Sequence, residues 1–283
     1  MTGEVYPWPA FREWMVELAA RNESRHEKLY GLIEAYDRFV GLVLNRPHGL
    51  DSSRPQDYLA CILLVRAFRL MIGGLWLGAS GYSDLSPSLG RTIWEIGIRL
   101  VYSQKAPEAA AFAFFVHADT RELESMEAEL HHRRSRGEDV GKLPANCERM
   151  REHRAELESL AAARGVDLAK ALNLFGRLNV RQACREMGVE KAYLVDYAFA
   201  SGHVHEQNLT TPSFLSVSDG LAQYELGPVE SGDTEAVTLD LLRDFSLVAD
   251  AAAHLVEDEG AVALAEKIQA QLIKTLGEVR GGV

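Results

Sequence analysis

The stretch that most limits the possible folds of this chain is a long apolar segment, YLACILLVRAFRLMIGGLWLGASGY, over residues 58–82. Its length and hydrophobicity are those of a membrane span, but Arg66 and Arg69 lie near its middle. A charged side chain at that depth in a bilayer costs several kcal/mol. We therefore predict the central helix of a soluble protein, with both arginines paired or at the bundle surface.

Charge and cysteine content restrict the partners that this chain can have. Its formal net charge of −11 disfavours an anionic membrane or an extended nucleic-acid-binding surface as a partner, although a small basic pocket is compatible with it. Three widely spaced cysteines without a CxxC pair indicate reduced thiols. The N-terminus lacks a basic region followed by an apolar run, so no secretory signal is expected. Together these features predict a cytoplasmic protein.

Helical spacing of apolar residues dominates the chain, and strand-like alternation is confined to a short region at 212–229. We predict a single all-α domain, a multi-helix bundle spanning 1–283, because no internal repeat or long linker divides it. It would comprise N-terminal helices at 1–50, a core at 55–210 and a C-terminal helical hairpin at 236–280. A long irregular loop rich in Thr, Ser, Gly and Pro is expected near 209–237.

Local start and stop signals place the individual helices. Ser24 and Glu27 form a capping-box pattern, and the helix that follows should end before Arg46-Pro47. The remaining helices are predicted at about 55–79, 86–104, 108–137, 145–163, 167–174, 179–187, 190–202, 236–257 and 259–277.

A polar cluster follows the predicted helix at 190–202. Tyr193, Tyr197 and Ser201 recur at steps of four and therefore share one helix face; Gly202, His203, Val204, His205 and Glu206 follow. Paired histidines beside a hydroxyl group suit general acid–base catalysis near neutral pH. The alternative is a helix end whose histidines bond the last free carbonyl groups.

A second cluster places charge on an apolar background. In RTIWEIGIRLVY, Arg91, Glu95 and Arg99 lie on one helix face, and Arg66 and Arg69 lie on the preceding helix. If the two helices pack antiparallel, one carboxylate meets several guanidinium groups. Such an excess of arginine suits a phosphate or carboxylate ligand. The alternative is a structural Arg–Glu–Arg ladder.

Arg21-Asn22-x-x-x-His26 matches RNxxxH, a short signature of the HEPN (higher eukaryotes and prokaryotes nucleotide-binding) ribonucleases. A looser Arg–His spacing arises by chance in a chain this rich in arginine, so only the Asn makes the match notable. Whether the motif has a function or is a coincidence stays open at this point.

Metal and cofactor signatures are weak. His131 and His132 are adjacent and point apart on a helix, and His203-x-His205 would need a distant third ligand such as His117, Asp119 or His254. No HExxH, GxGxxG, P-loop or GxSxG pattern occurs. We therefore expect neither a metal nor a cofactor, and a metal-dependent hydrolase is the least favoured function.

Two blocks resemble a bacterial family known as domain of unknown function 5677. The first is the helical hairpin with Arg91 and Glu95, and the second is NVRQACREMGVEKAYLVDYAFASGHVH, with Tyr193, Tyr197, Ser201 and His205 in the family's order. Phe175-Gly176-Arg177 stands where the family has an aromatic-Gly-Lys run. At fold level the family in turn resembles the HEPN superfamily, which implies a nuclease only by analogy.

Two functional hypotheses follow. In the first, a metal-independent endoribonuclease of the defence or toxin type, His205 with His203 removes a proton from a ribose 2′-hydroxyl and Arg91 or Arg66 stabilises the phosphorus-centred transition state. This requires a homodimer, because one bundle offers only a shallow cleft. In the second, a non-catalytic binding or scaffold module, Arg66, Arg91, Glu95 and His205 form a structural network. An anionic small ligand would contact Arg66, Glu95, Tyr197 and Ser201.

Overall fold

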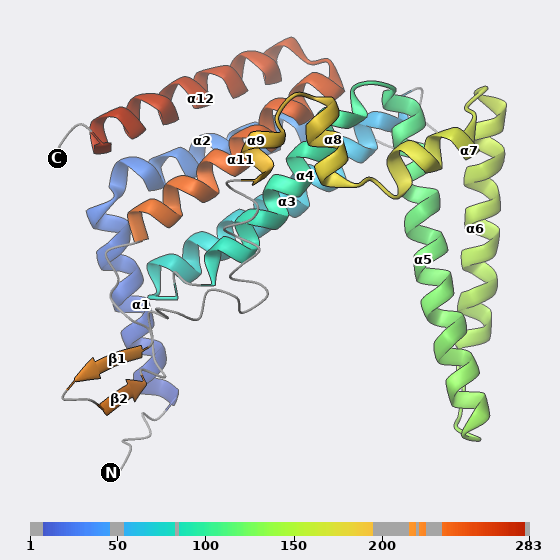
Figure 1. Ribbon diagram of the computed structural model, residues 1–283, viewed down its shortest axis with the longest axis horizontal. Coiled ribbons are helices and arrows are strands. Elements are labelled where there is room, and N and C mark those ends of the chain that lie inside the picture. Colours follow the sequence, from blue (N-terminus) through green and yellow to red (C-terminus); the bar gives the residue numbers. More distant parts are fainter. Residues whose placement is uncertain are drawn as a thin grey trace.

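The computed structural model describes residues 8–45, 54–82, 85–194, 215–218, 221–224 and 234–280, and helices form almost all of these ranges (Figure 1). This confirms the all-α prediction. The elements are α1 (Trp8–Arg25), α2 (Glu27–Leu44), α3 (Pro55–Ala79), α4 (Ser86–Ser103), α5 (Pro107–Ser135), α6 (Leu143–Ala163), α7 (Leu168–Ala171), the π-helical turn η1 (Leu172–Gly176), α8 (Val180–Glu186), α9 (Glu190–Ala192), α11 (Thr234–Val256) and α12 (Glu259–Arg280), with the short strands β1 (Leu215–Ser218) and β2 (Leu221–Tyr224).

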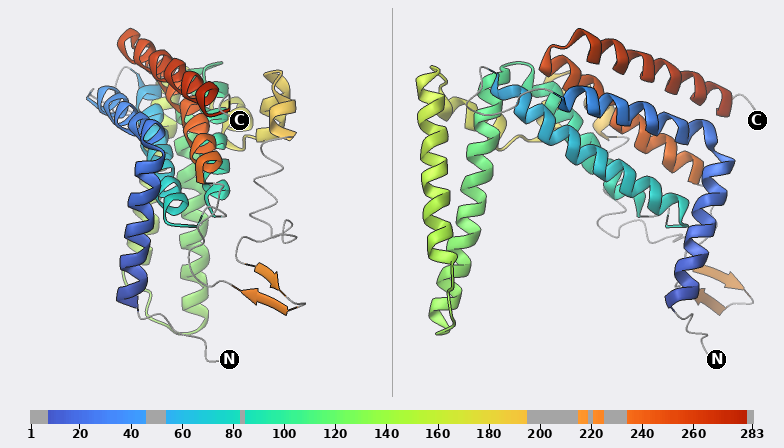
Figure 2. Two further views of the ribbon diagram at one scale, coloured as in Figure 1. Left: turned by 90° about the vertical axis from the view of Figure 1, so that its left-hand side faces the viewer. Right: turned by 180° about the vertical axis from the view of Figure 1, so that it is seen from behind.

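The main core lies around α11, which packs along α3 and α4 and is covered on its other side by α2 and α12 (Figures 1 and 2). Phe245 and Leu242 of α11 are fully buried among side chains such as Leu64 and Ile93. Tyr36 of α2 stacks edge-on against Phe245 and donates a hydrogen bond from its hydroxyl group to the Leu242 carbonyl at 3.3 Å. The C-terminal hairpin thus completes the core that α3 and α4 begin.

The apolar segment forms α3, over the range predicted from the sequence. It is the one helix in the described ranges that is long and apolar enough to cross a membrane, a property that core helices of soluble proteins share, and half of its most apolar window is buried. Arg66 and Arg69 are exposed at the bundle surface, as the sequence allowed. Packing against α11 explains why this helix is so apolar.

A second body projects from the first. The distal half of α5 pairs with α6 to form an arm, residues 118–163, which extends away from the helices of the main core (Figures 1 and 2). It has a small apolar centre of its own, with buried Leu123, Leu130 and Cys147. Ion pairs cross its two helices, as between Arg151 and Glu127 at 2.6 Å. The arm is therefore held largely by its own contacts.

The capping box at Ser24 and Glu27 is wrong: α1 continues through Arg25, so Ser24 lies in the last turn of one helix, and His26 caps α2 without a side-chain bond. Most of the loop predicted at 209–237 lies outside the described residues. Within the part that the structure describes, β1 and β2 pair as an antiparallel hairpin in which Leu215 faces Tyr224.

Candidate functional site

The predicted charged face of α4 is present. Arg91 donates from Nε to Glu95 Oε1 at 3.0 Å, an i,i+4 ion pair with both side chains partly exposed. Arg99, one turn further on, instead donates from Nη1 to the Phe175 carbonyl at 3.1 Å. Arg99 is therefore held by a hydrogen bond to another element, the turn at Phe175, and not by a continuous Arg–Glu–Arg ladder along α4.

Burial and neighbouring charges both act on Arg99. Its guanidinium lies 5.8 Å from the centre of the Phe114 ring. Burial lowers the pKa of Arg99 most, the Glu95 carboxylate raises it, and the Arg66 guanidinium lowers it. Arg66 of α3 and Arg99 of α4 are thus close enough to repel each other, as the antiparallel packing of these helices predicted.

The family-like run Phe175-Gly176-Arg177 closes the same region. A Cβ at Gly176 would lie 3.4 Å from the His117 Cβ and 3.6 Å from the Ala113 carbonyl oxygen, so this turn rests directly against α5. With the Phe175 carbonyl held by Arg99, the turn places the exposed Arg177 next to His117. The run positions a cation at the base of the arm.

His117 is set among cations. Burial lowers the pKa of its imidazole most, and the guanidinium groups of Arg177, Arg121 and Arg99 lower it further, while Glu124 raises it. Because a free histidine already titrates near 6.5, this imidazole is neutral at pH 7. It offers one hydrogen-bond donor and one acceptor beside several positive charges.

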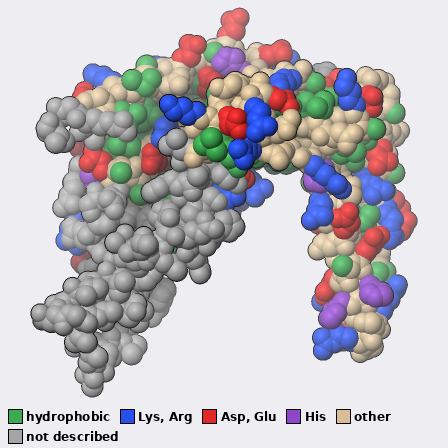
Figure 3. Space-filling view, in the orientation of Figure 1, with side chains coloured by type: hydrophobic (Ala, Val, Ile, Leu, Met, Phe, Trp, Pro, Cys, Tyr) green, Lys and Arg blue, Asp and Glu red, His purple; other side chains and the backbone are tan. Residues whose placement is uncertain are grey.

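We call this group the corner cluster: Arg66, Arg91, Glu95, Arg99, His117, Arg121 and Arg177, contributed by α3, α4, α5 and the residue after η1. Figure 3 shows Lys or Arg and His side chains where the arm leaves the rest of the molecule. Arg91 pairs with Glu95 and Arg121 with Glu124. Arg66 and Arg177 have no ion pair within the ranges that the structure describes. Positive charge therefore exceeds negative charge, as in sites for phosphate or carboxylate groups.

The predicted histidine turn is not described. His203, His205, Tyr197 and Ser201 all lie outside the described residues. The chain leading to them is placed, because the Tyr193 ring lies 6.1 Å from the Trp94 ring of α4. Trp94 is the residue before Glu95, so this segment enters its undescribed part beside the helix that carries Arg91.

Asn22 of the RNxxxH match is buried between helices, where it has a structural role. Its side chain is 3% exposed and donates a 2.7 Å hydrogen bond to the Ala79 carbonyl at the end of α3. Arg21 is exposed, and His26 lies at the break between α1 and α2. The Asn that made the match notable therefore fastens α1 to α3.

The considered metal ligands are dispersed. His131 and His132 are exposed on the arm, Asp119 pairs with His153 at 2.8 Å, and His254 lies against the Asp250 carbonyl. No group of three His, Cys, Asp or Glu side chains with metal-binding spacing occurs among the residues described. The absence of a metal stays a prediction.

The sequence does not bring together two members of the corner cluster, His117 and Arg177. Its patterns indicate His117 only as a distant metal ligand and Arg177 only as a departure from the family's aromatic-Gly-Lys run. A glycine allows the backbone to approach a neighbouring element closely, but no pattern in the sequence identifies α5 as the element that Gly176 contacts.

Comparison with family models shows which protein family the chain belongs to. The model of the family of unknown function DUF5677 matches residues 57–221, more than half of the sequence. The chain belongs to this family. No curated protein and no solved structure matches it. The DUF5677 match extends from α3 to β2 and includes every residue of the corner cluster.

Proposed function

We propose that this DUF5677 protein is a helical binding module whose corner cluster takes a small ligand with a phosphate or carboxylate group. The observation that carries the proposal is the meeting of Arg99, Arg121 and Arg177, from three separate elements, around His117, with Arg66 close to Arg99. Arg66 and Arg177 make no ion pair in the described part of the chain, so they are available to an anion.

The residues divide the work. Arg99 fixes the turn that carries Arg177 through its bond to the Phe175 carbonyl, so it is a positioning residue. Arg66 and Arg177 donate to the anion, and the neutral His117 contributes one further hydrogen bond. Arg91 forms an ion pair with Glu95 at 3.0 Å. The Glu95 carboxylate therefore competes less with the bound anion for the other guanidinium groups.

Inorganic pyrophosphate is the test ligand, followed by NMR on the His117 ring in the full chain. Pyrophosphate should bind saturably and raise the His117 pKa, because an adjacent anion favours the imidazolium form. The Arg177→Ala variant should bind about ten-fold more weakly.

The matched control is Arg149→Ala, at an exposed position of α6 where the guanidinium donates a hydrogen bond to the Asn146 side chain. It should leave both the affinity and the His117 titration unchanged. A His117 resonance that does not respond to pyrophosphate, or equal binding by Arg177→Ala, would contradict the proposal.

A second candidate is metal-independent RNA cleavage by a HEPN-like homodimer. It is favoured by the contact of Tyr193 with Trp94, which places the last described residues before His203 and His205 beside the helix of Arg91. In this function His205 removes the proton from a ribose 2′-hydroxyl, and Arg91 or Arg66 stabilises the transition-state charge.

Cleavage of varied RNAs by the purified chain in the presence of a chelator tests this candidate. His205→Ala should lower the rate by about 100-fold or more without changing the melting temperature, since general bases contribute that much. Arg91→Ala should also reduce cleavage, and a dimer should be seen by light scattering. Intact RNAs under these conditions would exclude the nuclease and leave the binding function in place.

A further inference from the structure

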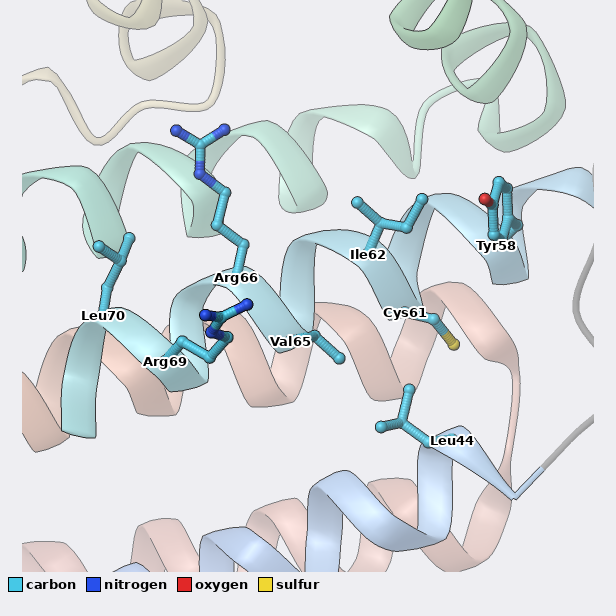
Figure 4. Close-up of a pocket in the computed structure, with 8 residues that line it drawn as sticks. All are labelled: Leu44, Tyr58, Cys61, Ile62, Val65, Arg66, Arg69 and Leu70. Atoms are coloured by element: carbon cyan, nitrogen blue, oxygen red, sulfur yellow. The ribbon is translucent and has the colours of Figure 1, made fainter. Parts of the chain in front are cut away.

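A groove of about 770 Å³ runs along α3 and is lined by side chains of α3 and by Leu44 of α2. Its walls include Leu44 of α2 and Ile62, Val65 and Leu70 of α3, and its polar lining includes two arginines, Arg66 and Arg69 (Figure 4). The volume is within the range of pockets that take small organic ligands.

The lining of the groove changes from apolar at one end to positively charged further along. Tyr58, Ile62 and Leu44 lie towards one end, while Arg66 and Arg69 lie further along α3 (Figure 4). Tyr58 stacks on Phe115 of α5 with ring centres 5.1 Å apart, which gives the apolar end an aromatic wall. From Tyr58 to Leu70 the helix rises about 18 Å, at about 1.5 Å per residue. A ligand with a long apolar tail and a single negatively charged head would match this arrangement, with the tail at the apolar end and the head at the arginines.

The charge at the head end is uncompensated. Arg69 is exposed and has neither an ion pair nor a hydrogen bond within the described ranges, and the same is true of Arg66. Figure 4 shows Arg66 directed towards α4, whereas the Arg69 side chain folds back along α3. Arg66 thus borders the corner cluster, and Arg69 belongs to the groove alone. A guanidinium beside an apolar surface can donate two parallel hydrogen bonds to a carboxylate whose apolar tail lies on that surface.

We propose that this groove binds a monomeric long-chain fatty acid, with the carboxylate on Arg69 and Arg66 and the alkyl chain along Val65, Ile62 and Leu44. Burial of the chain against these side chains supplies the affinity, and the arginines select an anionic head over a neutral one. This site shares Arg66 with the corner cluster, whereas Arg69, Val65, Ile62 and Leu44 belong to the groove alone.

Displacement of the fluorescent fatty acid parinaric acid from the full chain tests the proposal. Palmitate should displace it saturably, and hexadecanol, which lacks the charge, should compete about ten-fold less well. Arg69→Ala should weaken palmitate binding about ten-fold, because a charge-assisted hydrogen bond is lost. Val65→Asp should weaken it further by placing an anion in the path of the chain. Val65 is half-buried, and thermal melts will show whether this variant is folded.

Two control variants separate this site from others. Arg149→Ala on the arm and Arg177→Ala in the corner cluster should bind palmitate as the wild-type chain does. Co-sedimentation with phosphatidylglycerol vesicles distinguishes a free fatty acid from a membrane, and the protein should stay in the supernatant. The proposal is overturned if parinaric acid does not bind saturably, if Arg69→Ala binds palmitate normally, if the protein sediments with vesicles, or if the groove is closed by a dimer that Val65→Asp dissociates.

Discussion

At the scale of the residue, Gly97 decides how closely α4 and α11 approach. A Cβ at this position would lie 2.8 Å from both Cγ and Cδ2 of Leu247, closer than side-chain carbons pack. To admit this carbon, Leu247 would have to change its side-chain rotamer or α11 would have to move away from α4. The absence of a side chain at Gly97 is therefore required by the contact between two core helices.

Replacing Gly97 with alanine should lower the free energy of unfolding by about 1–3 kcal/mol, because overpacking outweighs the gain in helix propensity. The matched control is Gly31→Ala in α2, where nothing lies within 4 Å of the new Cβ. That variant should be more stable by about 0.5–1 kcal/mol. Urea unfolding of both variants measures the difference, and changes of the same sign would refute the packing explanation.

At the scale of the element, α8 is fastened to α4 by a short polar network. The Tyr102 hydroxyl donates to Glu186 Oε2 at 2.6 Å, and Lys105 Nζ approaches the same oxygen at 3.1 Å. The hydrogen bond from Tyr102 is the main reason that the pKa of Glu186 falls to about 2. Residues 84 positions apart are thereby joined at the surface.

This network predicts a pH dependence of stability. The Glu186 carboxylate titrates near 4.5 when unfolded and near 2 when folded, so its contribution is present above about pH 4.5 and is lost as the pH falls towards 2. Glu186→Gln should therefore reduce the loss of stability between pH 6 and pH 3 in urea unfolding. Glu156→Gln, on an exposed arm residue with no hydrogen bond in the described part of the chain, should not. Equal pH profiles for Glu186→Gln and the wild type would show that the network is not formed in solution.

At the scale of the whole molecule, the protein has two unequal cores. The main core gathers residues from α2 to α4, α11 and α12, whereas the arm relies on a few side chains around Leu123, Leu130 and Cys147. The corner cluster lies where these two parts join, because α5 belongs to both. Motion of the arm would therefore change the distances within the cluster.

Hydrogen exchange should separate the two parts. Amides in the distal arm, residues 123–150, should exchange at least about ten-fold faster than those in α11, since local opening follows the amount of buried apolar contact. Pyrophosphate bound at the corner should slow exchange at the base of α5 and leave α12 unchanged. Equal protection in the arm and α11 would mean that both belong to one cooperative unit.

Much of the helical framework could be predicted because its signals are local. Pro55 at the start of α3, the Ser86-Pro87 start of α4 and the apolar spacing of both helices act within a few residues, independent of the rest of the chain. The break between α1 and α2 was placed wrongly for the same reason. Ser24 has the residue type of a cap, but Asn22 anchors the preceding helix to α3, and no local pattern reports that contact.

The sequence by itself determined an all-α protein with an apolar central helix and an arginine-rich second helix. Only the tertiary structure decided that His117 lies beside Arg177, because sixty residues separate them and their meeting depends on how η1 rests on α5. It also decided that Arg69 borders an open groove. Helix formation depends on neighbours a few positions away, whereas the charges and hollows of a site depend on packing between distant segments.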